Sequence, residues 1–377
     1  MTASAPMLLV HDAAVRQNVA AFASRTGGRL MAVLKADGFG HGSIAHSVVA
    51  SGATSIGVTT IDEALAVRSS GAAVPVVSWL NPVDADFEGA LLADVDVAVA
   101  GPELLGAVSR AALRTRRTAR IHLHVDIGMA RDGASPSDWA ALCSAARELH
   151  ALGTVRVVGV MGHMSCADQP ENPQNDRERL LFANAVRTAR RRGLSGFVTH
   201  LAATAATVTG VGDGYEVHRI GAGLFGIDPS GTATDLQPTL SLTAPVVGVR
   251  RVDAGVGIGY GGDHVVDRRT NLALLPLGYG DGLPRSASGR AEVLVRGRRR
   301  PLVGRFSMDT VVVDTGDDRL HLGETVTLFG PGTDGAPLVA DWARWADTIE
   351  HEIVTRIGSR VARVHRTASR TTETAHA

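Results

Sequence analysis

The sequence is almost free of lysine. Lys35 is the only lysine among 377 residues, so arginine supplies the other 37 of its 38 Lys and Arg side chains. Arginine can replace lysine as a surface cation, but its guanidinium stays protonated above about pH 12, whereas a buried ammonium can lose its proton near neutral pH. A lysine kept at one position therefore points to amine chemistry there. The alternative is that an arginine-rich composition left one lysine by chance.

Cysteine and long hydrophobic runs are also scarce. The two cysteines, Cys143 and Cys166, are too few for a disulfide framework and favour a reducing compartment. No apolar run reaches the roughly 18 residues that span a bilayer. Residues 1–10 lack the positive charge and the apolar core of a secretion signal. We therefore expect a soluble, globular, cytoplasmic protein.

An excess of charge of either sign is absent as well. With 38 acidic and 38 basic residues, the chain has no overall electrostatic attraction to nucleic acid or to an anionic membrane. Three arginine clusters without interleaved aromatic residues are expected on solvated surface helices or loops: Arg114, Arg116 and Arg117; Arg190, Arg191 and Arg192; and Arg298, Arg299 and Arg300. Neither a nucleic-acid nor a membrane partner is predicted.

Residues 28–228 alternate short apolar, β-branched runs with longer amphipathic stretches. Eight such alternations predict a closed (β/α)8 TIM-type barrel. A Rossmann-like domain is the alternative, but no G-x-G-x-x-G turn follows the first strand. The expected strands are Leu30–Leu34, Ser55–Thr59, Val74–Ser78, Val95–Ala100, Arg120–Val125, Val157–Met161, Phe197–His200 and Gly223–Ile227; the expected helices include Ile61–Ser70, Pro102–Thr115, Pro136–Leu152 and Asn175–Arg192.

The pattern changes after about residue 236. Short β-type segments separated by Gly, Pro and Asp turns predict a mainly β domain, so we expect one domain over residues 1–235 and another over residues 236–377. A helix is expected at Val339–Ile349, and a polar, disordered tail from Thr367. The expected β segments are Leu240–Val252, Thr270–Leu277, Ala291–Val295, Asp309–Asp314 and Glu324–Phe329.

Polar and basic residues stand where the apolar runs of the predicted barrel end. Catalytic groups of such barrels follow the carboxyl ends of the strands, so these positions are the informative ones. Lys35 closes the first run, and Arg219 precedes the last. The other residues at such positions are Trp79, the segment from Asp126 to Arg131, His163, His200 and Thr204.

Residues 32–42, which read AVLKADGFGHG, resemble the pyridoxal-phosphate attachment segment of alanine racemases. The resemblance continues in the family's order over most of the chain, which makes it far more specific than any one segment. The further segments are 126–131 (DIGMAR), 162–164 (GHM), 200–205 (HLAATA), 218–226 (HRIGAGLFG), 259–261 (GYG), 277–285 (LGYGDGLPR) and 303–309 (VGRFSMD).

The resemblance implies a racemase with two bases. Lys35 would carry pyridoxal 5'-phosphate and act as a base on one face of the substrate Cα. Tyr260, one of three tyrosines, would act on the opposite face. In this family that tyrosine comes from the other subunit, so the resemblance implies a homodimer with shared active sites. A cationic network of His163 and arginine is expected to help Tyr260 act as a base.

The resemblance also implies contacts to the cofactor and the substrate. Arg219 would face the pyridine nitrogen and keep it unprotonated, with His200 supporting it from behind. Arg131 would bind near the phenolic oxygen and the substrate carboxylate, although an ordinary surface salt bridge is the alternative. Other cofactor residues would be Trp79, His163, Thr204, Gly221, Ala222 and His351; the backbone N–H of Met308 and Tyr279 would meet the substrate, with Asp309 supporting them. No metal ligand set is implied.

Several positions depart from the family pattern. Phe39 and His351 stand where tyrosines are usual, which removes two phenolic donors from the phosphate site. His124 stands where a lysine is frequent, and Thr204 replaces a serine. Ala203, Ser307 and Phe225 are further departures. Alanine is therefore the default substrate, and racemisation of another amino acid such as serine, decarboxylation, or a non-catalytic pyridoxal-phosphate carrier stay open as alternatives.

Overall fold

A computed structural model of the protein describes residues 5–366 in two compact units. The first, called the barrel unit, consists of Arg16–Gly38 and Ser43–Leu236. The second, called the β-rich unit, contains the described residues up to Val15, the segment Phe39–Gly42 and those from Gln237 onward. The domain division at residue 235 stays a prediction, and the tail expected from Thr367 lies outside the described residues.

The barrel unit is built on one sheet of eight parallel strands, in the order β8-β7-β6-β5-β4-β3-β2-β9. A single parallel bridge between Ala203 and Arg219 joins the two ends of this order. The predicted (β/α)8 barrel is therefore confirmed. The strands are β2 (Leu30–Val33), β3 (Ser55–Val58), β4 (Val76–Ser78), β5 (Val95–Val99), β6 (Ala119–His124), β7 (Val155–Met161), β8 (Val198–His200) and β9 (His218–Ile220).

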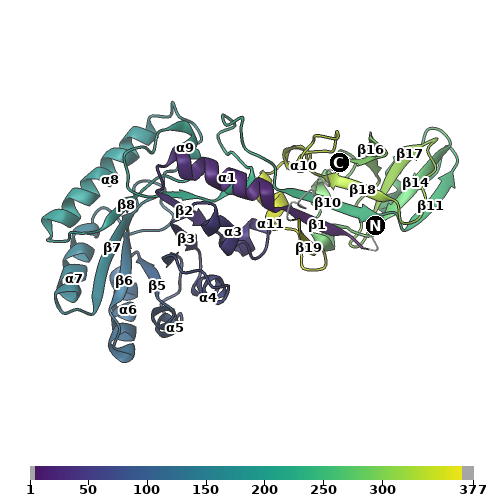
Figure 1. Ribbon diagram of the computed structural model, residues 1–377. Helices are drawn as coiled ribbons and strands as arrows, with labels where there is room; N and C mark the ends of the chain where they lie inside the picture. The colour runs from purple at the N-terminus through teal and green to yellow at the C-terminus, as the bar shows by residue number, and fades with distance from the viewer. Residues whose placement is uncertain (1–4, 367–377) are drawn as a thin grey trace, which may run out of the picture. The chain divides into compact units, whose positions relative to one another are not determined.

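Helices cover the outer face of this sheet (Figure 1). α6 shows why they form: Pro102 occupies its first turn, and Leu105, Val108 and Ala112 bury one side of the helix at a spacing of three and four residues. The helices are α1 (Asp12–Arg25), α3 (Ala45–Ala50), α4 (Ile61–Ser69), α5 (Phe87–Leu92), α6 (Pro102–Thr115), α7 (Trp139–Ala151), α8 (Gln174–Arg191) and α9 (Thr204–Thr209).

The last barrel strand was predicted at the wrong place. Gly223–Ile227 is not a strand; Ala222–Phe225 form a 3-10 turn (η1), and the eighth strand is β9, His218–Ile220. The apolar run is buried, but a short buried run can be a turn as well as a strand. β9 lacks the apolar pattern because His218 and Arg219 make buried hydrogen bonds.

The β-rich unit contains a nine-stranded sheet in the order β11-β14-β17-β16-β15-β18-β10-β1-β19. The predicted β segments match strands of this sheet, whereas β1, β16 and β19 were not predicted. Its strands are β1 (Met7–His11), β10 (Leu240–Pro245), β11 (Gly248–Val252), β14 (Thr270–Leu275), β15 (Glu292–Val295), β16 (Arg298–Val303), β17 (Val311–Gly316), β18 (Thr325–Phe329) and β19 (Ala362–Arg366). Two short strands, β12 (Gly257–Ile258) and β13 (His264–Val265), pair separately.

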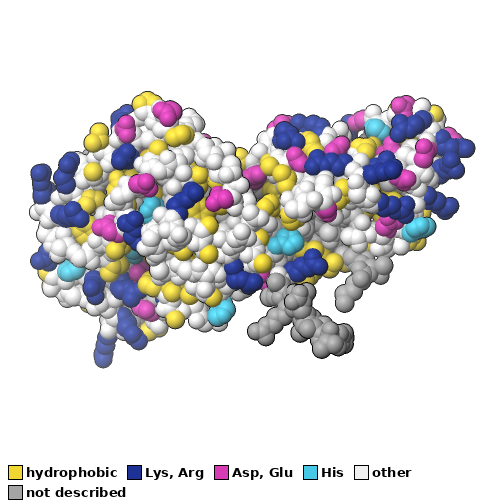
Figure 2. Space-filling view, turned by 45° about the horizontal axis from the view of Figure 1, so that its top comes forward, with side chains coloured by type: hydrophobic (Ala, Val, Ile, Leu, Met, Phe, Trp, Pro, Cys, Tyr) yellow, Lys and Arg dark blue, Asp and Glu magenta, His cyan; other side chains and the backbone are white. Residues whose placement is uncertain are grey.

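Two local expectations for this unit need correction. Arg298, Arg299 and Arg300 lie in strand β16, not in a helix or loop, and each pairs with an acidic side chain. Arginine and acidic side chains are interspersed on the visible face of this unit, at the right of Figure 2. The helix expected at Val339–Ile349 is α10 (Val339–Ala346), followed by α11 (Glu350–Thr355); left-handed Asp347, with a φ of 54°, separates them.

The segment Phe39–Gly42 is tied to residues far along the chain. The Arg363 Nε donates to the carbonyl oxygen of Gly40 at 2.7 Å, and the His41 Nε2 lies 2.7 Å from the Thr239 Oγ1. A Cβ on Gly40 would lie 2.4 Å from the carbonyl oxygen of Val354, so only glycine fits there.

Of the helices in residues 5–366, none is both long enough and apolar enough to cross a membrane.

Candidate active site

Lys35 begins a left-handed turn directly after β2. Ala36, Asp37 and Gly38 have φ values of 55°, 54° and 60°, and the Gly38 N–H donates to the carbonyl oxygen of Leu34 at 2.9 Å. Left-handed backbone costs about 1–2 kcal/mol for each residue that has a Cβ. Such strain persists only where surrounding contacts hold it, and it is frequent at functional sites.

Glu63 holds this turn in place. Its Oε1 accepts from the Ala36 N–H at 2.7 Å, and its Oε2 accepts from the Thr59 N–H at 2.8 Å. Thr60 in turn caps α4 and accepts from the Glu63 N–H. One carboxylate therefore connects the ends of β2 and β3. We did not predict Glu63 as a site residue; the Thr60-x-x-Glu63 capping-box pattern was the signal for it.

The surroundings of Lys35 favour its neutral amine. Burial lowers the pKa of Lys35, and the nearby Arg131 and Arg219 guanidinium groups lower it further, while the Glu63 carboxylate opposes them. Desolvation and repulsion between like charges both penalise the ammonium form. The amine is therefore easier to deprotonate than an exposed lysine.

Arg219, on β9, is buried among hydrogen-bond acceptors. Its guanidinium donates to the carbonyl oxygens of Gly162 and His200, and it lies 3.2 Å from the Nδ1 atoms of both His163 and His200. Burial lowers its pKa to about 10, with repulsion from Arg131 as a smaller cause. Arg219 therefore remains a fixed cation at neutral pH.

His163 is a neutral imidazole, which corrects the expectation that it is cationic. Burial, followed by the charges of Arg219, Arg131 and Lys35, lowers the pKa of His163 to about 3. Burial also lowers the pKa of His200 well below its usual value, with His122 and Arg219 adding to the effect. Both rings can therefore accept a hydrogen bond from Arg219 at Nδ1.

Thr204 is hydrogen-bonded to the turn after β9, where the phosphate site was predicted. The Thr204 Oγ1 accepts from the N–H groups of Gly221 and Gly223, each at 3.3 Å, and Ala222 lies between these two residues. The hydroxyl keeps its own proton to donate. A Cβ on Gly223 would lie 2.4 Å from the Phe22 ring, so glycine is required for this turn.

Two more predicted residues, Trp79 and Arg131, lie in the barrel unit. Trp79, after β4, lies over Gly57, where an added Cβ would meet its ring at 2.4 Å. Arg131 is exposed and lies close enough to lower the pKa values of Lys35, His163 and Arg219. The adjacent Asp132 bonds to the His124 Nδ1 at 3.1 Å, and this bond lowers the pKa of Asp132.

The predicted residues of the β-rich unit lie on neighbouring loops. Tyr260, Met308 and Tyr279 are 68%, 53% and 39% exposed. The Tyr279 N–H donates to the carbonyl oxygen of Ser307 at 3.1 Å, which joins two of these loops. Arg360 reinforces the junction, because it donates to Asp281 at 2.9 Å and to Asp309 at 2.7 Å. The sequence analysis missed Arg360, for which no local motif existed.

Further contacts in this unit concern Tyr260 and the departures from the family pattern. Arg305 pairs with Asp263, which connects the loop of Tyr260 with the loop of Met308. His351 lies in α11, and its ring centroid is 6.0 Å from that of Phe39. The two residues that replace tyrosines therefore lie together.

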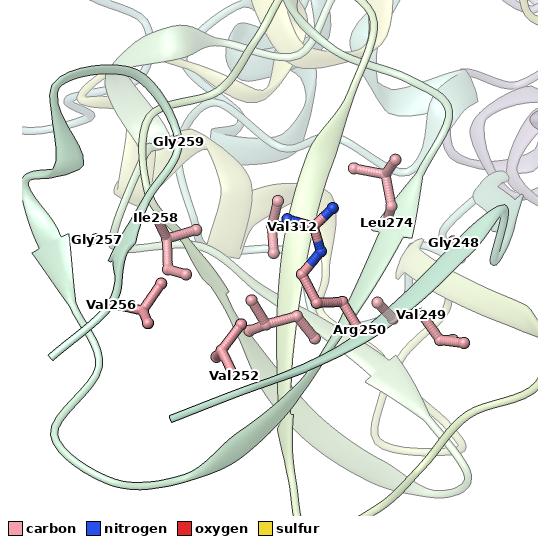
Figure 3. A pocket seen from close by; sticks show the side chains of 12 residues that line it. Gly248, Val249, Arg250, Val252, Val256, Gly257, Ile258, Gly259, Leu274 and Val312 are labelled. Carbon is pink, nitrogen blue, oxygen red and sulfur yellow. The ribbon is translucent and has the colours of Figure 1, made fainter. Parts of the chain in front are cut away.

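A separate cavity of about 310 Å³ lies in the β-rich unit (Figure 3). It is lined mainly by apolar residues of β11, β14 and the segment from Val256 to Gly259, with Val312 from β17. It holds none of the predicted site residues, although Gly259 directly precedes Tyr260. Among residues 5–366, no group of three or more His, Cys, Asp or Glu residues could hold a metal ion.

The comparisons with known proteins agree along the whole described chain. The model of the alanine racemase N-terminal domain matches residues 10–229, and that of the C-terminal domain matches residues 239–365. An alanine racemase of Thermobifida fusca (strain YX) is 42% identical over 362 residues, covering 95% of this chain and 97% of the relative. One from Mycolicibacterium smegmatis (strain ATCC 700084 / mc(2)155) is 42% identical, covering 89% and 88% of the two chains.

Solved structures give the same result. The alanine racemase of a D-cycloserine-producing Streptomyces lavendulae has a TM-score of 0.94 at 37% identity, covering 98% of this chain and 99% of that chain. The alanine racemase of Bartonella henselae, solved with covalently bound pyridoxal phosphate, shares the fold with a TM-score of 0.86 at 22% identity, covering 97% and 100% of the two chains.

Proposed function

The chain belongs to the alanine racemase family, and on that premise we propose that it interconverts L- and D-alanine with pyridoxal 5'-phosphate as cofactor and with Lys35 and Tyr260 as the two bases. It is an isomerase of the amino-acid racemase class. The observation that carries the proposal is the sole lysine of the chain, which lies at the carboxyl end of a barrel strand with its pKa lowered.

The residues of the barrel unit fit pyridoxal phosphate. Lys35 offers an amine for the aldehyde. The Thr204 hydroxyl accepts from the Gly221 and Gly223 N–H groups and keeps its own proton to donate to the phosphate, and the Ala222 N–H would be the further donor of this turn. When bound, this cofactor withdraws electrons from the substrate Cα and so makes its proton acidic.

Lys35 and Tyr260 would move the proton. The Lys35 Nζ would take it from one face of Cα, since its lowered pKa favours the neutral amine. Tyr260 would return a proton to the opposite face through its phenol oxygen. Arg131 and the N–H of Met308 would hold the substrate carboxylate. Racemisation then needs no net change in the substrate other than inversion.

Arg219 would limit the reaction to proton exchange. As a guanidinium it can only donate hydrogen bonds, so a ring nitrogen facing it would stay without a proton. A ring without that proton withdraws electrons less strongly, which shortens the life of a carbanion at Cα. His163, Trp79 and His200 would orient the ring and Arg219, and His351 would take the place of a missing phosphate donor.

We infer a homodimer in which each active site receives Tyr260, Tyr279 and Met308 from the other subunit. The exposure of these three side chains supports this arrangement, because large apolar and aromatic groups on a surface are available to a partner. A cytoplasmic location is part of the proposal. Its support is that Cys143 and Cys166 are both free thiols.

The test of the activity is incubation with L-alanine in deuterium oxide. We expect D-alanine to form, and each molecule of D-alanine formed should carry one deuterium atom at Cα. L-Serine is the comparison substrate, and release of CO2 from either amino acid would indicate decarboxylation instead. If the cofactor is bound but neither amino acid exchanges its Cα proton, the protein would be a pyridoxal-phosphate carrier, which would contradict the proposal.

A further inference from the structure

A chain of buried hydrogen bonds leads from Arg219 to the far side of the barrel. The His200 Nδ1 lies 3.2 Å from the Arg219 guanidinium, and the His200 Nε2 lies 2.9 Å from the His122 Nδ1. The His122 Nε2 lies 3.4 Å from the Asp96 Oδ2, and Asp96 is ion-paired with Arg120 at 2.5 Å. His200, His122 and Asp96 are all buried.

The barrel makes room for this chain at β7. His122 and His200 come from β6 and β8, which are not neighbours, so their rings meet on one face of the sheet across β7. A Cβ at Gly159 of β7 would lie 1.9 Å from the His122 Nδ1, so any other residue there would displace the ring. The β6–β7 register also shifts between Ile121 and His122. The His122 ring therefore occupies a space that the backbone provides.

The two ends of the chain fix the protons within it. Asp96, ion-paired with Arg120, can only accept, so His122 must donate to it from Nε2. Arg219 can only donate, so His200 must accept from it at Nδ1. These requirements agree only if both histidines are neutral with the proton on Nε2, and the N–H of His200 then donates to the Nδ1 of His122.

This series of hydrogen bonds also links the buried Arg219 cation to a carboxylate. In the described part of the protein its guanidinium contacts carbonyl oxygens and imidazole nitrogens but no carboxylate. A buried cation without a direct counter-charge is costly, and polarised hydrogen bonds can transmit part of the stabilisation. Asp96 is the carboxylate at the end of these bonds.

We propose that His122 and Asp96 are positioning residues for the racemase reaction: they hold His200 as an acceptor and thereby fix the Arg219 guanidinium toward the cofactor site. The inference rests on the proposed role of Arg219. Loss of the hydrogen bonds from Asp96 through His122 to His200 would free Arg219 to move. The pyridine nitrogen of the cofactor could then gain a proton. Turnover would fall, and transfer of the alanine amino group to the cofactor, which releases pyruvate, would increase.

The first test reads the protons directly, independently of activity. In cofactor-loaded protein with 15N-labelled histidine at pH 8, where racemisation is assayed, His122 and His200 should show an unprotonated Nδ1 and a protonated Nε2. The signals are assigned by their loss in His122→Phe and His200→Phe. A protonated Nδ1 in either ring would overturn the proposal.

The second test uses His122→Phe and Asp96→Asn in the loaded enzyme. We expect kcat to fall about 10-fold, with little change in KM, and the ratio of pyruvate to D-alanine to rise. His218→Phe is the matched control, because His218 is equally buried on β9 but bonds to Thr207 outside the chain. Asparagine has nearly the shape of aspartate, so unchanged kcat and product ratio in Asp96→Asn would refute the role even if His122→Phe does not fold.

Full racemase activity in Arg219→Gln would instead contradict the proposed function. It would not change the protonation assigned to His122 and His200.

Discussion

At Lys35, charge and nucleophilicity can be separated by one substitution. Lys35→Arg should keep the positive charge at the end of β2 but lose the cofactor linkage and turnover, because a guanidinium does not deprotonate at neutral pH. Borohydride reduction followed by mass spectrometry should find the cofactor on the peptide of residues 30–45 in the wild type alone. Arg114→Lys, on the exposed end of α6, is the control for adding a lysine elsewhere and should bind no cofactor. Cofactor found on that new lysine in place of Lys35 would contradict the assignment.

The buried histidines should make stability depend on pH. His163 has a pKa of about 3 when folded and about 6.5 when unfolded, so the unfolded chain binds more protons between these values. Above about pH 6.5 the titration of His163 should therefore not affect the free energy of unfolding. As the pH falls toward 3, the free energy of unfolding should decrease, by at most about 1.4 kcal/mol per pH unit for this group.

Urea unfolding of the cofactor-free protein at pH 7 and pH 5 measures this effect. His163→Phe should lose less stability than the wild type over the same interval, because the titrating group is gone. An equal loss in both proteins would show that His163 does not contribute.

Sequence reasoning worked at this scale where a residue's chemistry is independent of its surroundings. The polar residues at the predicted strand ends and the resemblance to alanine racemases predicted that Lys35, Arg131, His163 and Arg219 lie together, and their charges do act on one another. The charge of His163 was predicted wrongly, because burial and three neighbouring cations decide it and neither is visible in the sequence. Glu63 was missed for a related reason, since its second bond, to Ala36, spans 27 residues.

Among the elements, the left-handed turn after Lys35 depends most on a single partner. Glu63→Gln should keep the length of the side chain but replace one acceptor oxygen by an NH2 group, which cannot accept from either Ala36 or Thr59. We expect a loss of about 1.5–3 kcal/mol in the free energy of unfolding, the usual value of a hydrogen bond to a charged group. Weaker cofactor binding should accompany it.

Urea unfolding and cofactor titration check this prediction. Glu103→Gln, in the first turn of α6, is an exposed control and should change stability by less than about 0.5 kcal/mol. Equal stabilities of the two variants would show that Glu63 does not hold the turn.

The predicted strands match the structure where a strand is buried on both faces. β2, β4 and β5 show as mainly apolar runs because both faces of a barrel strand are covered. β19 was missed because its residues Ala362–Arg366 are largely exposed and polar, and β16 because it begins with three consecutive arginines, each ion-paired. β9 was missed because its polar side chains are satisfied inside the barrel. In each case tertiary contacts, and not the local sequence pattern, determine that the segment forms a strand.

For the whole molecule, a shared active site predicts complementation between two inactive variants. In co-expressed Lys35→Arg and Tyr260→Phe chains, a mixed dimer has one site with both wild-type bases and one site with neither. Random pairing makes half of the dimers mixed, so about one quarter of the wild-type activity should return.

Racemase assays on the co-purified mixture and on each variant alone test this prediction. Sedimentation should show dimers in all three samples. Activity in the mixture no higher than in the separate variants would place both bases in one subunit.

The path of the chain through residues 39–42 bears on when the enzyme becomes competent during synthesis. The four residues that follow the Lys35 turn pack against Thr239, Val354 and Arg363, which leave the ribosome more than 190 residues later. A nascent barrel that ends before residue 239 holds its lysine on a turn whose downstream anchor has not yet been made. A chain cut short before residue 239 therefore lacks the partners that hold the segment immediately after the Lys35 turn.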